Sequence, residues 1–254
     1  MTAPRLEGRV LVTGAAGMLG SQLLLTAPGG VEAVGTDLVA APAGNPPVAR
    51  AGLDLSSREA VAALFAELRP VGVIHGAAYT AVDKAEEEEP RAAVANAEVP
   101  RVVAEACARA RIPLVHVSTD FVFDGEKRTP YTVDDRPRPL SAYGRTKLAG
   151  EEFVRAAYNA AAIVRTQWLY GPRGRHFPGT ILGLAASKPE LKVVHDQFGS
   201  PTSTLELAPA LWDVLAARGG GLYHAACEGQ ASWFEFAAAT LELCHKATPV
   251  KTCT

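Results

Sequence analysis

Cysteine is scarce in this sequence of 254 residues, and its copies are not spaced as a metal site or a disulfide framework requires. The four cysteines are Cys107, Cys227, Cys244 and Cys253, and no two of them form a CxxC pair. The spacing argues against zinc-binding and disulfide-stapled scaffolds. We expect incidental or buried thiols in a reducing compartment, and no metal-ligating residues.

An excess of charge and long apolar runs are also lacking. Lys and Arg total 25, Asp and Glu total 27, and the formal net charge is −2. This balance does not indicate nucleic acid or an acidic membrane as the partner, and the run "EEEE" at 86–89 is interpreted as a solvated helix face. No 18 consecutive residues are apolar, and no apolar signal segment precedes the first predicted strand. We therefore expect a cytoplasmic protein without a membrane span.

What the sequence does contain is a regular alternation of short β-branched runs with segments rich in Ala and Leu. Strands are predicted at 9–14, 31–37, 71–78, 112–118 and 161–171, and helices at 18–27, 57–70, 90–111 and 142–158. Pro100 is expected to kink or break the third helix. The alternation is typical of a doubly wound parallel sheet with helices on both faces. The regularity fades after about residue 171, so we predict a main domain over 1–171 and a smaller lobe over 172–254, with helical patterns at 205–217 and 232–246.

A glycine-rich loop follows the first predicted strand and opens a helix. "TGAAGMLG" spaces Gly14, Gly17 and Gly20 three residues apart. Plain turn glycines are the alternative interpretation, but this context favours a loop whose backbone N–H groups approach a diphosphate at a helix N-terminus. Asp37 ends the second strand, where a carboxylate accepts hydrogen bonds from the adenosine ribose. The pattern predicts a Rossmann-type α/β fold that binds a dinucleotide, and because the next arginine is Arg50, Asp37 favours NADH over NADPH.

A Tyr–Lys pair predicts the chemical end of the site. In "SAYGRTK" Tyr143 and Lys147 are four residues apart, so they lie on one face of a helix. A nearby ammonium, together with the positive charge of an oxidised nicotinamide, lowers the pKa of a phenol, and the phenol can donate a proton to a carbonyl oxygen as hydride reaches its carbon. The spacing alone also fits an exposed surface pair. Downstream of a dinucleotide loop, the catalytic interpretation is favoured.

Three polar residues, Ser118, Thr119 and Asp120, end the fourth predicted strand, and their polarity would be costly inside a buried sheet unless they were paired. The carboxyl ends of such strands face the ligand crevice, so we predict that these residues border it. His75 and His116 lie within strand patterns and are interpreted as packed core residues rather than ligands.

These motifs resemble the extended short-chain dehydrogenase/reductase superfamily and, more narrowly, the dTDP-4-dehydrorhamnose reductases. The resemblance runs from about residue 9 to the end, through "VTGAAGMLG", "GAAYTAVDKAE", "VSTDFVFDG", "PLSAYGRTKLAGE", "VRTQWLYG" and "DQFGSPT". The first and fourth motifs belong to the whole superfamily, whereas "AAYTAVDKAE", "STDFVFDG" and "DQFGSPT" are narrower. The resemblance implies reduction of the C4 ketone of dTDP-4-dehydro-L-rhamnose to dTDP-L-rhamnose with NADH or NADPH.

The resemblance also implies the roles of individual residues. Tyr143 would donate the proton, Thr119 would hydrogen-bond the reacting oxygen, and Lys147 would bind the nicotinamide ribose and tune Tyr143. The implied cofactor-binding residues are Gly14, Ala16, Gly17, Met18, Gly20, Asp37, Asp54, Leu55, Ala77, Ala78, Tyr79, Asn96, Tyr143 and Lys147. The implied substrate-binding residues are Thr119, Asp120, Trp168 and Gln197. Two of these have a second interpretation, since Asp54 also fits the cap of the helix at 57–70 and Trp168 also fits plain core.

Two departures from the family pattern bear on substrate binding. Gln167 stands where the family has a small hydroxyl residue, and strand alternation predicts that it faces away from Trp168. Beyond "HKATPVKTCT" the resemblance implies several tens of further residues with an Arg-Pro element that closes the substrate-binding lobe. In a chain without this Arg-Pro element, we expect substrate affinity and activity to change, together with any dimer contact or Mg²⁺ site that uses that segment. Mg²⁺ rests on the resemblance alone, and a monomer or a homodimer is expected.

Three hypotheses stay open on the sequence. The first is a nucleotide-sugar 4-ketoreductase, and the second is an epimerase or dehydratase of the same superfamily. A dehydratase needs an acid and a base next to Thr119. Asp120 could supply the acid, but Phe121, at the next position, cannot act as a base. The third is a regulatory subunit that keeps the fold and binds NADP without turnover. The intact set of Thr119, Tyr143 and Lys147 favours catalysis.

Overall fold

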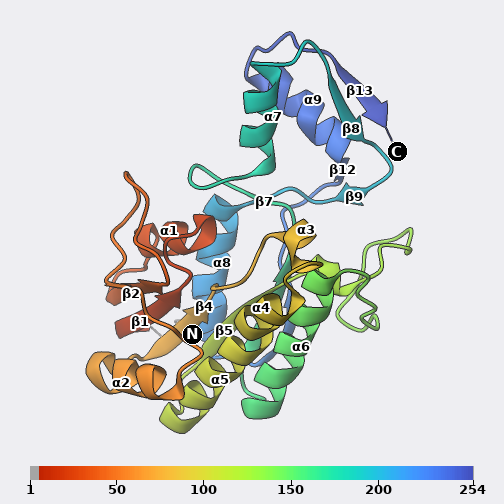
Figure 1. Ribbon diagram of the computed structural model, residues 1–254. Helices are drawn as coiled ribbons and strands as arrows, with labels where there is room; N and C mark the ends of the chain where they lie inside the picture. Colours follow the sequence, from red (N-terminus) through yellow and green to blue (C-terminus); the bar gives the residue numbers. More distant parts are fainter. Residues whose placement is uncertain (1–5, 254) are drawn as a thin grey trace.

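The computed structural model describes residues 6–253 and is built around a seven-stranded parallel sheet (Figure 1). Its strands are β1 (Gly8–Thr13), β2 (Val31–Asp37), β3 (Arg50–Ala51), β4 (Gly72–His75), β5 (Leu114–Thr119), β6 (Ala162–Thr166) and β11 (Gly221–His224). They lie in the order β11-β6-β5-β4-β1-β2-β3, and every neighbouring pair is parallel. The predicted Rossmann-type doubly wound sheet is confirmed. The short strand β3 is additional, so the strand that ends in Ser118 and Thr119 is the fifth along the chain rather than the fourth.

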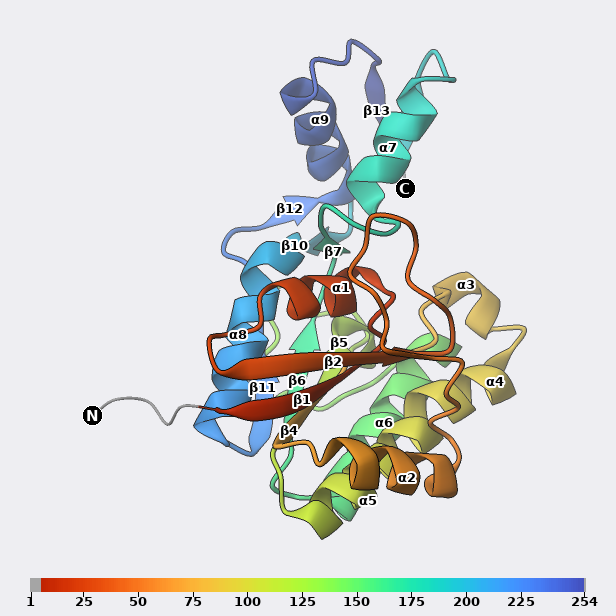
Figure 2. The same cartoon turned by 90° about the vertical axis from the view of Figure 1, so that its left-hand side faces the viewer.

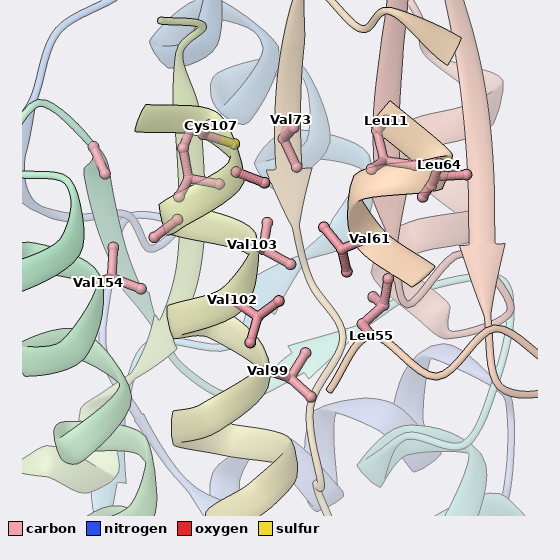
Figure 3. Packing of buried hydrophobic residues seen from close by; sticks show 14 of the residues in the cluster. Leu11, Leu55, Val61, Leu64, Val73, Val99, Val102, Val103, Cys107 and Val154 are labelled. Carbon is pink, nitrogen blue, oxygen red and sulfur yellow. The ribbon is translucent and has the colours of Figure 1, made fainter. Parts of the chain in front are cut away.

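Helices cover both faces of the sheet because its central strands are apolar on both faces. Leu11 of β1 packs with residues of α2 (Arg58–Leu68) and α5 (Val99–Ala110) (Figure 3). Its neighbours Val10 and Val12 pack with α1 (Met18–Leu25) and α8 (Thr204–Ala217) on the opposite face. Figure 2 shows these two layers, with α6 (Ala142–Ala157) beside α5. Successive strand residues point to opposite faces, so "RVLV" supplies both cores.

The helix predicted at 57–70 is α2, and Ser57 caps it by accepting a hydrogen bond from the N–H of Ala60. The alternative in which Asp54 caps this helix is therefore wrong. Asp54 instead accepts the N–H of Ser56 at 2.9 Å, and this hydrogen bond lowers the pKa of its carboxyl. Its side chain remains available to the neighbouring cleft.

The helix predicted at 90–111 is interrupted. It consists of α4 (Glu89–Ala93), one π-helical turn η1 (Val94–Glu98) and α5, with the short α3 (Val82–Ala85) before it. Pro100 lies in the first turn of α5, where its missing N–H is tolerated. The predicted break of the helix is thus present, and it lies in the π-helical turn just before Pro100.

The strand predicted at 161–171 is also broken, because β6 ends at Thr166 and the chain resumes as β7 (Leu169–Tyr170). β7 leaves the main sheet and pairs with β10 (Thr202–Ser203). Trp168 lies at the break with a left-handed backbone, φ 46°. The prediction that Gln167 faces away from Trp168 is therefore wrong, since strand alternation does not hold there and both residues line the same cleft.

A smaller lobe extends from the main sheet at the top of Figures 1 and 2. It contains α7 (Phe177–Ala185), α9 (Trp233–Leu243) and the pairs β8 (Leu191–Val194) with β13 (Val250–Cys253) and β9 (Phe198–Gly199) with β12 (Ala231–Ser232). Its core is apolar, with Ile181, Leu191 and Leu241 buried. Between these segments the chain returns to the main sheet as α8 and β11. The outer ends of the two predicted domains, residues 1–5 and 254, lie outside the described residues.

None of the helices between residues 6 and 253 has the length and apolar character needed to cross a bilayer.

Candidate active site

A cavity of about 670 Å³ opens at the carboxyl ends of the strands. Parallel sheets of this kind bind ligands at that edge. The predicted site residues that line it are Gly14, Gly17, Met18, Gly20, Asp37, Asp54, Leu55, Ala77, Ala78, Thr119, Asp120, Tyr143, Lys147 and Trp168. Ala16, Tyr79, Asn96 and Gln197 lie outside this lining set. One continuous cleft, which we call the active-site cleft, therefore joins the predicted cofactor end to the predicted chemical end.

The glycine loop is shaped for a ligand phosphate. Gly14 has φ +70°, and a Cβ there would lie 2.7 Å from the backbone N of Ala77. A Cβ at Gly20 would overlap the carbonyl oxygen of Gly14, so glycine is needed for the packing of α1 on the loop. Gly17 is the N-cap of α1, and among the described residues no side chain caps this helix and no acid lies in its first turn. The exposed N–H groups and helix dipole fit a diphosphate.

Asp37 faces the same end of the active-site cleft. Its carboxylate accepts the N–H of Ala16 at 3.0 Å and that of Val39 at 3.3 Å. The N–H of Ala16, predicted to contact the diphosphate, thus helps to position Asp37. The register of β2 and β3 sets Arg50 beside Thr36, next to Asp37, although the guanidinium of Arg50 is paired with Glu67.

Asn96 supports the wall opposite the glycine loop. It is fully buried in the π-helical turn, and its amide binds the backbone of Tyr79 through Oδ1 to N at 2.8 Å and Nδ2 to O at 3.2 Å. Its Nδ2 also donates to Thr146 on α6 at 3.1 Å. The Tyr79 hydroxyl donates to Glu88, and Tyr79 does not line the cleft. Ala77 and Ala78 form the wall itself, and Asn96 fixes the backbone of Tyr79 next to them.

The Tyr–Lys pair lies on the first turns of α6, which Ser141 caps by accepting the N–H of Gly144 at 3.1 Å. Lys147 is 2% exposed, and its ammonium donates to the carbonyl of Val117 at 2.7 Å. Burial lowers the pKa of Lys147 to about 8, while the charge of Glu151 acts in the opposite direction. At neutral pH Lys147 is therefore mainly charged, with donors left for a ligand.

Burial raises the pKa of Tyr143 to about 12, opposed by a hydrogen bond with Thr119 and reinforced by the charge of Asp120. The residues of the protein alone therefore raise this pKa, and its lowering by Lys147 together with an oxidised nicotinamide stays a prediction. Desolvation is the largest effect on the phenol, and the ammonium of Lys147 is engaged by the carbonyl of Val117 on β5. Phe121 packs edge-on against the Tyr143 ring at 5.4 Å.

Thr119 and Asp120 turn out of β5 at the rim of the active-site cleft. The Thr119 hydroxyl accepts the N–H of Phe121 at 3.2 Å and donates to Asp120 Oδ1 at 3.0 Å. Burial raises the pKa of Asp120 to about 6, partly offset by the hydrogen bond from Thr119. These contacts account for two of the three polar residues that end the strand, and the predicted rim is present.

Ser118 binds a buried ion pair that the sequence analysis missed. Its hydroxyl donates to Glu151 Oε1 at 2.5 Å, and Arg165 donates to both oxygens of Glu151 at 2.9 and 2.6 Å. Glu151 is 0% and Arg165 3% exposed. The i+4 spacing from Lys147 to Glu151 and the single charge in "AIVRT" are the signals for this pair.

The two strand histidines are packed core residues, as predicted. Their rings stack with centroids 5.4 Å apart, and His75 Nδ1 lies 2.6 Å from the Thr13 hydroxyl. Burial and the charge of Lys147 lower the pKa of His75 to about 3 and hold that of His116 well below its usual range. Both rings are therefore neutral at physiological pH.

The far end of the active-site cleft is aromatic. Trp168 lines the cleft and stacks on Trp233 of α9, with ring centroids 3.5 Å apart and planes at 10°. Gly174 and Arg175, from the loop between β7 and α7, line it as well and were not predicted. Gln197 is exposed on the loop between β8 and β9 and is not among the lining residues. Within residues 6–253, no group of His, Cys, Asp and Glu gathers as a metal site.

The chain was compared with known proteins. The family model of the RmlD substrate binding domain matches residues 8–254. A probable dTDP-4,6-dihydroxy-2-methyloxan-3-one 4-ketoreductase of Streptomyces antibioticus is 44% identical over 90% of this chain and 75% of its own length. A dTDP-4-dehydrorhamnose reductase of Mycolicibacterium smegmatis is 43% identical, over 92% of this chain and 68% of its own. The dTDP-4-dehydrorhamnose reductase of Bacillus anthracis, solved in complex with NADP, is 36% identical with a TM-score of 0.90, covering 98% of this chain and 85% of that one.

Proposed function

Because the chain belongs to the dTDP-4-dehydrorhamnose reductase family, we propose that it reduces the C4 ketone of dTDP-4-dehydro-L-rhamnose to dTDP-L-rhamnose, as an NAD(P)-dependent oxidoreductase. One observation carries the proposal. Thr119, Tyr143 and Lys147 line a single cleft together with the glycine loop. A hydride donor bound along that loop would have the proton donor at its reactive end.

The cofactor supplies the hydride when it is bound. We assign the diphosphate to the glycine loop with Gly17 and Met18, and the adenosine ribose to Asp37. Asp54 and Leu55 are assigned to the adenine, and Ala77 and Ala78, supported through Asn96, to the opposite wall. We favour NADH over NADPH, because the carboxylate of Asp37 would repel a 2′-phosphate and the adjacent Arg50 is engaged by Glu67.

In the proposed chemistry, Tyr143 holds the proton that the product needs. With a pKa of about 12, its phenol stays protonated at neutral pH. It gives the proton up only to a strong base, such as the alkoxide oxygen that forms when hydride reaches C4. Thr119 would hold the reacting oxygen by turning its single O–H donor from Asp120 to that oxygen when the substrate binds. Lys147 keeps two of its N–H donors for ribose hydroxyls while its third is fixed on Val117.

The substrate end is proposed from the positions of Thr119, Asp120 and Trp168 on the cleft. Gln197 would contact the nucleotide sugar only if the exposed loop that carries it approached the cleft. The lobe that contains α7 and α9 is proposed as the substrate-binding lobe, with α8 and β11 counted with the nucleotide-binding domain. A bound Mg²⁺ is not part of the proposal. A monomer or homodimer and a cytoplasmic location stay predictions.

The test is to mix the protein with dTDP-4-dehydro-L-rhamnose and NADH or NADPH and to follow the absorbance of the reduced nicotinamide. Oxidation that depends on both the protein and the sugar nucleotide is expected. Binding of NADH or NADPH without any oxidation would favour the regulatory-subunit hypothesis and reject the reductase.

A second candidate is a 4-ketoreductase that acts on another dTDP-linked deoxysugar. The relative from Streptomyces antibioticus, at 44% identity, carries such a name and supports this candidate. Competition between dTDP-4-dehydro-L-rhamnose and other dTDP-4-keto-6-deoxysugars, compared by kcat/KM, separates the two. The epimerase or dehydratase alternative is disfavoured, because Phe121 stands where a base would be needed beside Thr119 and Asp120.

A further inference from the structure

We propose that Trp233 of α9 and Gly199 of β9 are positioning residues for the sugar end of the cleft, because together they hold Trp168 in a strained backbone conformation that makes its indole a wall of the site. The inference rests on the proposed function, since it concerns the subsite for the nucleotide sugar. It assigns a role to Trp233, which lies outside the motifs of the sequence, and to Gly199, which lies within "DQFGSPT" without a role of its own there.

The backbone of Trp168 is unusual for such a large residue. Its φ of 46° lies in the left-handed region, which is unfavourable for bulky side chains. Among residues 6–253, four other non-glycine residues have positive φ: Arg69, Arg111, Arg218 and His245. All four follow the C-terminus of a helix, where this conformation is common. Trp168 instead lies between β6 and β7 and faces the cleft, so its strain is maintained by its surroundings.

Two contacts from the smaller lobe maintain it. The Trp233 ring covers one face of the Trp168 indole, nearly parallel at 3.5 Å between centroids. A Cβ at Gly199 would lie 2.6 Å from Cε2 of Trp168 and 2.8 Å from Oε1 of Gln167, so only glycine allows both side chains to lie where they do. The β9–β12 pairing sets Gly199 opposite Ala231, two residues before Trp233. The two contacts therefore belong to one local unit.

This unit is anchored within the lobe and not in the cleft. Trp233 packs against Phe177 of α7 at 4.5 Å, and Phe236 lies 5.4 Å from Phe177. The position of the Trp168 indole is thus set by the packing of α7 against α9. A sugar ring presents apolar C–H surface as well as hydroxyls, and an indole edge or face of fixed orientation discriminates between such surfaces.

The stack itself is testable without activity. Two parallel indoles at this distance couple their electronic transitions and give a paired positive and negative band in the far-ultraviolet circular dichroism. The chain has three tryptophans, and the third, Trp212, is buried on α8 against the main sheet. The paired band should disappear in both Trp168→Phe and Trp233→Phe and persist in the control Trp212→Phe. Persistence of the paired band in Trp233→Phe would refute the stack.

The functional role is tested by KM values. Trp233→Ala and Gly199→Ala should raise the KM for the sugar nucleotide about three- to tenfold, the range of an aromatic pair, and leave the KM for NADH within about twofold. Trp212→Phe is the control here too, because Trp212 packs on α8 against the main sheet and belongs to neither the Trp168–Trp233 stack nor the core of the smaller lobe. Thermal unfolding checks that each variant is folded, and Trp233→Phe serves if Trp233→Ala is not. A Trp233 variant that loses the paired band yet keeps the wild-type KM would overturn the role.

The dissociation constant for dTDP-L-rhamnose, measured by calorimetry, repeats this comparison without turnover. If the wild type binds this nucleotide sugar but does not oxidise NADH or NADPH, the proposed function fails, while the ratio of dissociation constants between Trp233→Ala and wild type still decides the role of Trp233. A wild type that neither binds nor turns over refutes both proposals.

Discussion

The buried ion pair between Glu151 and Arg165 gives the sharpest prediction on stability. Arg165→Met keeps the length and apolar volume of the side chain but removes its charge and donors. Glu151, at 0% exposure, is then left with the hydrogen bond from Ser118 and with the charge of Lys147. An uncompensated buried charge is strongly unfavourable, whereas the intact pair itself adds little over an apolar replacement.

The expected loss in the free energy of unfolding is about 3–5 kcal/mol for Arg165→Met, the usual cost of removing one partner of a buried pair. For a chain of this size, about 2–4 °C of Tm accompanies each kcal/mol, so Tm should fall by roughly 6–20 °C. The double variant Glu151→Leu with Arg165→Met removes both charges and should recover most of the loss, which a double-mutant cycle measures.

The loss should also depend on pH. Without Arg165, the buried carboxyl of Glu151 has a pKa raised above that of the unfolded chain, about 4.3. The folded form then binds the proton more tightly, so stability falls as pH rises from the unfolded towards the folded pKa. Urea unfolding at pH 5 and pH 8 should show the larger deficit at pH 8.

An exposed pair supplies the control for this prediction. Arg9 pairs with Glu32 at 3.1 Å with both side chains about half exposed or more, so Arg9→Met should cost at most about 1 kcal/mol. If Arg165→Met also costs less than about 1 kcal/mol at pH 8, or if its deficit is the same at both pH values, the reasoning about the buried pair is refuted.

Three further predictions concern the chemistry. Tyr143→Phe removes the phenolic proton and keeps the ring, so kcat should fall about 10²–10⁴-fold with NADH affinity retained in a fluorescence titration; unchanged turnover would remove Tyr143 from the role of proton donor. The pKa of Lys147 is about 8, so its charge is present below that pH and lost above it, and NADH affinity should weaken as pH rises through about 8. Lys147→Arg should retain affinity at higher pH if the charge alone matters, and an affinity of the wild type that is flat from pH 7 to 9 contradicts this. Asp37→Ala should raise the kcat/KM ratio of NADPH to NADH by about tenfold, and a wild type that already prefers NADPH would reject the basis of that expectation.

The fold and the cofactor end of the site could be predicted because their signals are local. "RVLV" supplies apolar residues for both faces of β1, and Gly14, Gly17 and Gly20 follow it within eight residues. The spacing of Tyr143 and Lys147 likewise lies within one helix. Such patterns fix an element and its neighbour without knowledge of the rest of the chain.

Features that depend on contacts between distant segments could not be predicted. The left-handed Trp168 broke a strand whose composition, "AAIVRTQWLYG", favours continuity, and what holds it comes from residues 199 and 233. The raised pKa of Tyr143 has the same origin. Its burial depends on how β5 and α6 pack, and desolvation outweighs the hydrogen bond from Thr119 that acts in the opposite direction.

The register of the sheet explains why polar residues gather beneath Lys147. Parallel pairing aligns His75 with His116 and Ser118 with Arg165 near the carboxyl ends of their strands. Helix α6 covers these positions with Glu151, and one turn further from the cleft it contributes Val154 to the apolar core. A change at Val154 should therefore alter stability alone. A change at Glu151 should alter stability and also lower the pKa of Lys147 further, because the carboxylate that raises it is lost. Ser118 hydrogen-bonds Glu151, and Glu151 raises the pKa of Lys147, so Ser118 belongs to the polar group that lies between the apolar core and Lys147.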